Sequence, residues 1–124
     1  MIVPNALLLA EVSTLLDEGK EVELLTKGCS MLPFIVGDKD SVRLRKCAWA
    51  QGDAVLAELT PGHFVLHRVL SIDRECVILK GDGNLSGTER CRLQDVRGKA
   101  VEVIKSGKNR IDCTDRGYMR RVRF

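Results

Sequence analysis

The chain has 124 residues and a mass of 13.8 kDa, which is the size of one domain spanning 1–124. Hydrophobic residues make up 44% of it, but only three Phe, one Tyr and one Trp are present, so Val, Leu and Ile must fill the core. The formal net charge of +3 is modest and gives no support for nucleic-acid binding.

The first predicted element is an amphipathic helix from Asn5 to Glu18, with Gly19 as a natural stop. Its apolar residues fall on one face: Leu8, Val12, Leu15 and Leu16. At 1.5 Å per residue the helix spans about 21 Å, which is shorter than the roughly 30 Å core of a bilayer. Glu11 and the lack of a preceding basic residue make it a poor signal peptide. We expect it to cover one edge of the domain, or a partner, in a cytoplasmic protein without stable membrane insertion.

Beyond Gly19 the pattern changes to short strands separated by turn residues. The expected strands are Glu21–Thr26, Ser41–Arg45, Ala54–Leu59, His63–Ile72, Glu75–Lys80, Val96–Ile104 and Ile111–Cys113. Strands without alternating helices predict a mainly β fold, a curled sheet or small barrel with one short N-terminal helix.

Cysteine usage bears on the compartment and on metal binding. The five cysteines include no Cys-x-x-Cys pair: Cys29, Cys47, Cys76, Cys91 and Cys113. An odd number without such pairs argues against a disulfide framework and against a finger-type zinc site. Reduced, partly buried thiols of a cytoplasmic protein are the expectation.

A candidate nucleophile, Ser30, lies in Gly28-Cys29-Ser30-Met31-Leu32-Pro33, where a strand gives way to a turn. A serine hydroxyl attacks a carbonyl only when a neighbouring base accepts its proton. The position can expose Oγ beside backbone N–H groups, and the Ser30 amide is the best candidate for holding an oxyanion. The alternative is an ordinary serine in a proline-containing turn.

His67 is the candidate base. It lies within a predicted strand, so Val65, His67 and Val69 share one face. Neutral histidine, with an unperturbed pKa near 6.5, accepts a proton at physiological pH with little tuning. A structural histidine in the core is the alternative. His63 shares that face but lies about 13 Å away at ~3.3 Å per residue, which suits a residue at the end of a loop.

Asp82, in Lys80-Gly81-Asp82-Gly83-Asn84, is the candidate acid. A carboxylate beside the imidazole would fix its tautomer and stabilise the imidazolium that forms. The same residues also make an ordinary turn. Lys80 is a competing base.

In this order the Ser30 motif, His67-Arg68-Val69 and the Asp82 motif resemble the signal peptidase and LexA-type serine peptidase superfamily, in its Ser-His branch. The resemblance covers about Glu21 to Val103. It implies the β-rich fold of that superfamily and serine chemistry without a metal or cofactor. It also implies an extended peptide or protein substrate, with Ser30, His67 and Asp82 as catalytic residues and Met31 and Pro33 against the substrate.

The chain departs from signal peptidases in two respects. Their serine usually follows a membrane anchor, and their further acidic residues have no obvious match in the segment from Leu85 to Glu89.

Three functions follow from these observations. The leading one is a soluble serine endopeptidase. The second is a LexA-like self-cleaving regulatory domain, for which the chain lacks a helix-turn-helix and a clear Ala-Gly or Cys-Gly cleavage site. The third is a catalytically inactive peptide-binding module. The arginines of residues 116–124 are expected to form a solvated tail with weak attraction to anionic surfaces.

Overall fold

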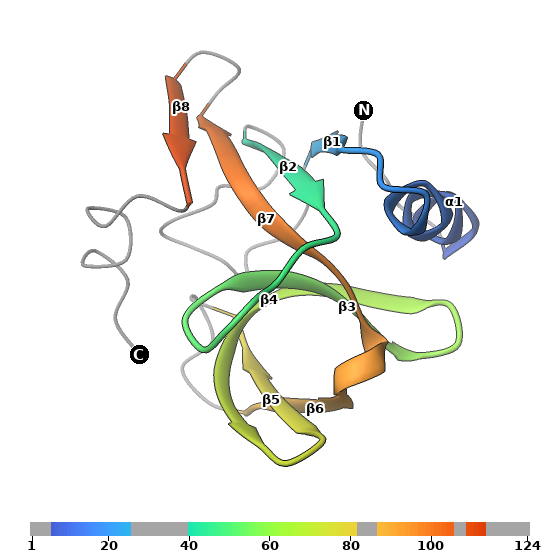
Figure 1. Cartoon of the computed structure of the whole chain (residues 1–124), viewed down its shortest axis with the longest axis vertical. Coiled ribbons are helices and arrows are strands. Elements are labelled where there is room, and N and C mark those ends of the chain that lie inside the picture. The colour runs from blue at the N-terminus through green and yellow to red at the C-terminus, as the bar shows by residue number, and fades with distance from the viewer. Residues whose placement is uncertain (1–5, 26–39, 82–86, 106–108, 114–124) are drawn as a thin grey trace.

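The computed structural model describes residues 6–25, 40–81, 87–105 and 109–113. These residues form one antiparallel sheet and one longer helix (Figure 1). The elements in chain order are α1 (Ala6–Asp17), β1 (Val22–Leu25), β2 (Ser41–Arg45), β3 (Ala54–Thr60), β4 (His63–Asp73), β5 (Cys76–Lys80), β6 (Glu89–Arg92), the 3-10 helix η1 (Leu93–Asp95), β7 (Val96–Lys105) and β8 (Asn109–Asp112). The predicted mainly β fold, a curled sheet with one short N-terminal helix, is confirmed.

The strands follow the order β1-β2-β7-β3-β4-β5-β6, and β8 pairs with β7. Every pair is antiparallel. Figure 1 shows β3, β4, β5 and β6 curling into a ring on one side of the molecule, with β1, β2, β7 and α1 on the other. The curl comes from the long hairpin of β3 and β4, whose pairing continues onto β5 and then β6.

Two apolar clusters form the core, one on each face of β3. The helix-side cluster joins α1 to β2, β3 and β7 and contains Val12, Leu16, Val42, Leu44, Ala54, Leu56, Ala100, Val103 and Cys113. The inner cluster lies within the curl and contains Val55, Ala57, Val69, Val77, Leu79 and Cys91. Because β3 contributes to both clusters, its first four residues are all buried, which accounts for its unbroken apolar run.

Helix α1 packs against the sheet as its spacing predicts. Val12 and Leu16 are buried, whereas Asp17 is exposed. The close approach depends on Gly98 of β7, where an added Cβ would lie 2.9 Å from Cδ1 of Leu16. In the described residues no helix is long and apolar enough to cross a membrane.

The seven predicted strands are present, with bounds shifted by at most a few residues, but β6 and η1 are not among the predicted elements. The sequence of β6 is Glu-Arg-Cys-Arg, which has one apolar residue and follows a glycine-rich segment. It becomes a strand because it pairs with β5, through Leu79 with Glu89 and Val77 with Cys91. Tertiary pairing here overrides weak local propensity.

We expect Leu16→Ala to lower the free energy of unfolding by about 2–5 kcal/mol, because it opens a cavity between α1 and β7. The measurement is urea denaturation. Leu93→Ala is the control, since Leu93 is 40% exposed and should cost well under half as much. Equal costs for the two variants would show that α1 does not depend on this contact.

Candidate functional site

Of the predicted site residues, the structure describes His67. Ser30, Met31, Pro33 and Asp82 lie outside the described residues. The described part of the site is therefore centred on His67 and on the strands that flank the other predicted residues.

His67 lies on β4 beside Val55 of β3 and is only 7% exposed. The predicted alternation of faces is confirmed, because Val65 and Val69 pack on the inner cluster, whereas Phe64 and Leu66 pack on the helix-side cluster. The imidazole therefore belongs to the inner face of the curled sheet, in a poorly solvated position where electrostatic interactions are weakly screened.

A carboxylate lies against the ring of His67. Nδ1 of His67 is 2.5 Å from Oε1 of Glu89, with side chains 9% and 31% exposed respectively. Glu89 pairs with Leu79 across β6 and β5, and Leu79 pairs with Val69 across β5 and β4. Since paired residues share a face, Glu89 is directed toward the same inner face as His67.

Glu89 is the site residue that sequence reasoning missed, because the strand that carries it was not predicted. A usable signal exists in the two-residue spacing between Glu89 and the buried Cys91. If this segment is read as a strand, that spacing puts both side chains on one face.

The residues after His67 are tied to the Gly52-Asp53 turn. The Arg68 side chain is fully buried and its Nη1 donates to the Gly52 carbonyl oxygen at 2.9 Å. Val69 exchanges backbone hydrogen bonds with this turn, donating to Asp53 at 2.8 Å and accepting from Gly52 at 2.9 Å. Gly52 itself has a φ of 97°, which favours glycine. These bonds fix the backbone next to His67.

Two other candidates are placed away from the His67 ring. Lys80 pairs with Arg68, one residue along β4 from His67, so the pleat directs it to the opposite face. His63 is exposed at the start of β4, as the sequence predicts. Neither residue shares the environment of His67.

Cys91 shares the inner face with Glu89, but its thiol is unreactive. Burial, with smaller contributions from the charges of Asp95 and Cys76, raises the pKa of the Cys91 thiol to about 11. The thiol therefore stays protonated at neutral pH and is a poor nucleophile.

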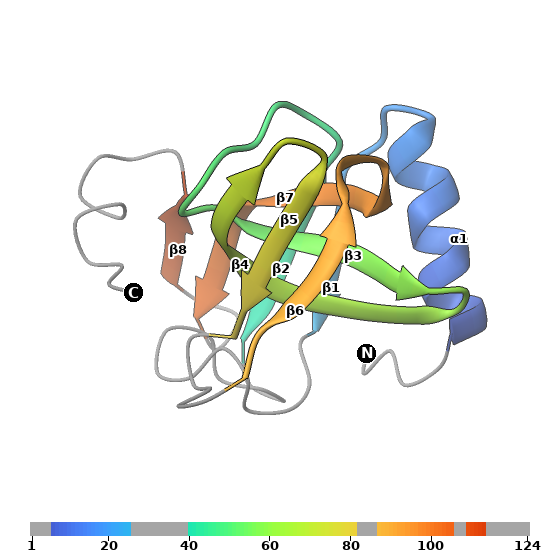
Figure 2. The same ribbon diagram turned by 90° about the horizontal axis from the view of Figure 1, so that it is seen from below.

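The strands that flank the remaining predicted residues end on one side of the molecule. The chain leaves β1 before Ser30 and enters β2 after it, and it leaves β5 before Asp82 and enters β6 after it. Figure 2 shows these four strand ends along the same lower side. Asp40, immediately before β2, is buried and its carboxylate contacts Nζ of Lys105 at the end of β7. This ion pair fixes the point where the chain returns to the sheet.

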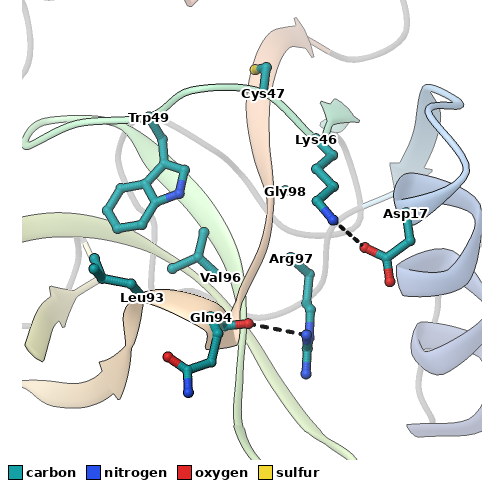
Figure 3. Close-up of a pocket in the computed structure, with 9 residues that line it drawn as sticks. All are labelled: Asp17, Lys46, Cys47, Trp49, Leu93, Gln94, Val96, Arg97 and Gly98. Atoms are coloured by element: carbon teal, nitrogen blue, oxygen red, sulfur yellow. Dashed lines mark hydrogen bonds and ion pairs between the residues drawn. The ribbon is translucent and has the colours of Figure 1, made fainter. Parts of the chain in front are cut away.

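A separate groove of about 450 Å³ lies between α1, the connection from β2 to β3, and η1 (Figure 3). Its cations are already engaged. Lys46 contacts Asp17 at 2.9 Å, and Arg97 contacts the Gln94 carbonyl oxygen at 3.1 Å and Glu58 at 2.9 Å. Neither His67 nor Glu89 is among the residues that line it, so we assign it no role in the chemistry of His67.

In the described part of the chain, no group of three or more His, Cys, Asp or Glu side chains is arranged to hold a metal ion. No protein-family model matches the sequence, and no curated protein matches it. The arrangement around His67 must therefore be interpreted from its own chemistry. A buried imidazole with a carboxylate at Nδ1 can accept a proton at Nε2 and carry the resulting positive charge.

Burial of Cys91 predicts a specific order of thiol modification in the native protein. At pH 8 only about one thiol in a thousand is ionised when the pKa is near 11, so iodoacetamide should modify the half-buried Cys47 and Cys76 well before Cys91. Peptide mapping by mass spectrometry after timed quenching measures the order. Modification of Cys91 as fast as Cys76 would contradict its assigned environment.

Proposed function

We propose that this chain is a serine endopeptidase that cleaves an extended peptide or protein substrate, with Ser30 as nucleophile and His67 as general base and then general acid. The observation that carries the proposal is the buried His67 ring with a carboxylate oxygen 2.5 Å from Nδ1. A neutral histidine that only filled core space would not need an anionic partner. A ring that accepts a proton does need one, because a buried positive charge is costly unless it is paired.

The chemistry proceeds in two steps of ordinary acyl transfer. In the first, Nε2 of His67 takes the Ser30 hydroxyl proton as Oγ bonds to the substrate carbonyl carbon. The protonated ring then gives that proton to the departing amine as the C–N bond breaks. In the second, water donates its proton to the same nitrogen and attacks the acyl ester, which releases the acid product and returns the proton to Ser30. The Ser30 amide N–H stabilises the oxyanion in both steps.

The choice of histidine over lysine as base is supported by the position of Lys80. Lys80 pairs with Arg68 and is directed to the face of β4 opposite His67. A lysine would also have to be desolvated before it could act as a base near neutral pH.

The β1 edge of the described sheet suits an extended substrate. β1 ends the sheet path and is the last described strand before the segment that carries Ser30. A peptide that adds to this edge would be oriented by main-chain hydrogen bonds, with its scissile carbonyl delivered toward Ser30 and its side chains against Met31 and Pro33. Asp40, held by Lys105, anchors the far end of that segment.

A cytoplasmic location fits the proposal. The apolar face of α1 is occupied by the sheet, with Val12 and Leu16 both buried, so the helix is used in packing.

We expect a fluorophosphonate probe to label Ser30 covalently in the wild-type chain. Ser30→Ala should abolish labelling, and His67→Ala should slow it by about 10²–10⁴-fold, since general-base catalysis contributes on that scale. Intact mass followed by peptide mapping identifies the labelled residue and its rate.

Lys80→Ala is the matched control for the base, and it should be labelled at nearly the wild-type rate. Equal labelling of the wild type and Ser30→Ala would remove the serine peptidase proposal. An unlabelled wild type that still binds extended peptides would instead identify a peptide-binding module.

A further inference from the structure

We infer that Glu89 is the positioning residue for His67, and that its carboxylate beside Nδ1 leaves Nε2 as the nitrogen that acts as the base. The inference rests on the proposed function and names the third member of the same site. It assigns the acid to β6, the strand that local sequence signals do not predict.

Strand register first brings the two side chains onto one surface. Val69, Leu79 and Glu89 form a continuous row across β4, β5 and β6. His67 lies two residues before Val69 and so points to the same face. Leu79 is fully buried in the inner cluster, which places the His67–Glu89 contact at the margin of a packed apolar surface.

The His67 and Glu89 side chains reach each other across the strand between them. β4 and β6 are separated by β5, a spacing of about 9.6 Å at ~4.8 Å per strand, so both side chains must lean across the middle strand. The pairing of Arg68 with Lys80 brings the next residue, the buried Gly81, alongside His67. Gly81, which follows β5, adds no side chain at this position.

The two nitrogens of the ring allow only one acid. A catalytic histidine uses one nitrogen to hold its carboxylate and the other to exchange a proton with the nucleophile. Nδ1 is already in contact with Glu89. A second carboxylate at the ring would have to take Nε2, which the reaction requires for the nucleophile.

Other nearby carboxylates are engaged elsewhere. Asp53 accepts a hydrogen bond from the Ala50 amide at 2.8 Å and lies 3.5 Å from Nζ of Lys99. Asp95 contacts Arg92 beyond the far end of β6. Among the described residues, Glu89 is the carboxylate in contact with the His67 ring.

The test compares Glu89→Gln, Glu89→Asp and Asp82→Asn in the full chain, with Glu102→Gln as the matched control. Glu102 is also a partly exposed, ion-paired sheet residue, but its partners are Arg43 and Arg110. Two readouts are needed: the titration of the His67 ring by ¹⁵N NMR, and the rate of probe labelling at Ser30.

Glu89→Gln should move the midpoint of the His67 titration to lower pH by about one unit or more, because the imidazolium loses its anionic partner. It should also slow labelling by at least about 10²-fold. Glu89→Asp should recover part of both effects, whereas Asp82→Asn and Glu102→Gln should leave the midpoint within a few tenths of a unit of wild type.

An unchanged midpoint in Glu89→Gln, or a large shift in Asp82→Asn, would overturn the inference. The NMR readout does not need a reactive serine. If the midpoint responds to Glu89→Gln as expected but wild-type Ser30 is never labelled, the His67–Glu89 pair stands and the peptidase proposal fails.

Discussion

Pairing of β6 with β5 is the constraint on which the candidate site depends. It turns a short, charged segment into a strand and brings Glu89 onto the inner face, in contact with His67. Without that pairing His67 would be a buried imidazole among valines, with no described carboxylate at its ring. The local strand propensity of Glu-Arg-Cys-Arg is weak, so the cross-strand contacts of Leu79 and Val77 hold the segment in place.

The surrounding fold holds the backbone of His67 in place from two sides. Strand β3 is buried on both faces and supplies Val55 beside His67, and the buried Arg68 guanidinium bonds to the Gly52 carbonyl behind it. Removing one partner of a buried charged group is expensive. The backbone at His67 is therefore held by its pairing with β3 and by the Gly52-Asp53 turn, which is the arrangement a positioned proton acceptor needs.

Much of the fold could be predicted because it follows from alternation of apolar residues. β2 begins and ends at its predicted residues, and α1 buries Val12 and Leu16 as their spacing indicates. β6 was not predicted because it has only one apolar residue and becomes a strand by pairing with β5. The burial of Arg68 also could not be foreseen. Alternation of residues along β4 predicts which face of the sheet Arg68 lies on, but the hydrogen bond to the Gly52 carbonyl oxygen is what makes burial of its guanidinium possible.

For the site, His67 was identifiable from its motif, whereas Glu89 was not, because their contact depends on the register of three strands. The predicted roles of Ser30 and Asp82 stay predictions, since both residues lie outside the described part of the chain.

The central claim is that His67 exchanges a proton with Ser30 during cleavage, and an experimental structure of the intact chain tests it most directly. The distance that matters joins Oγ of Ser30 to Nε2 of His67. The peptidase mechanism predicts about 2.6–3.2 Å, or a single bridging water. A structure in which Ser30 lies on the opposite face of the sheet from His67, with no path for a proton between them, would contradict it.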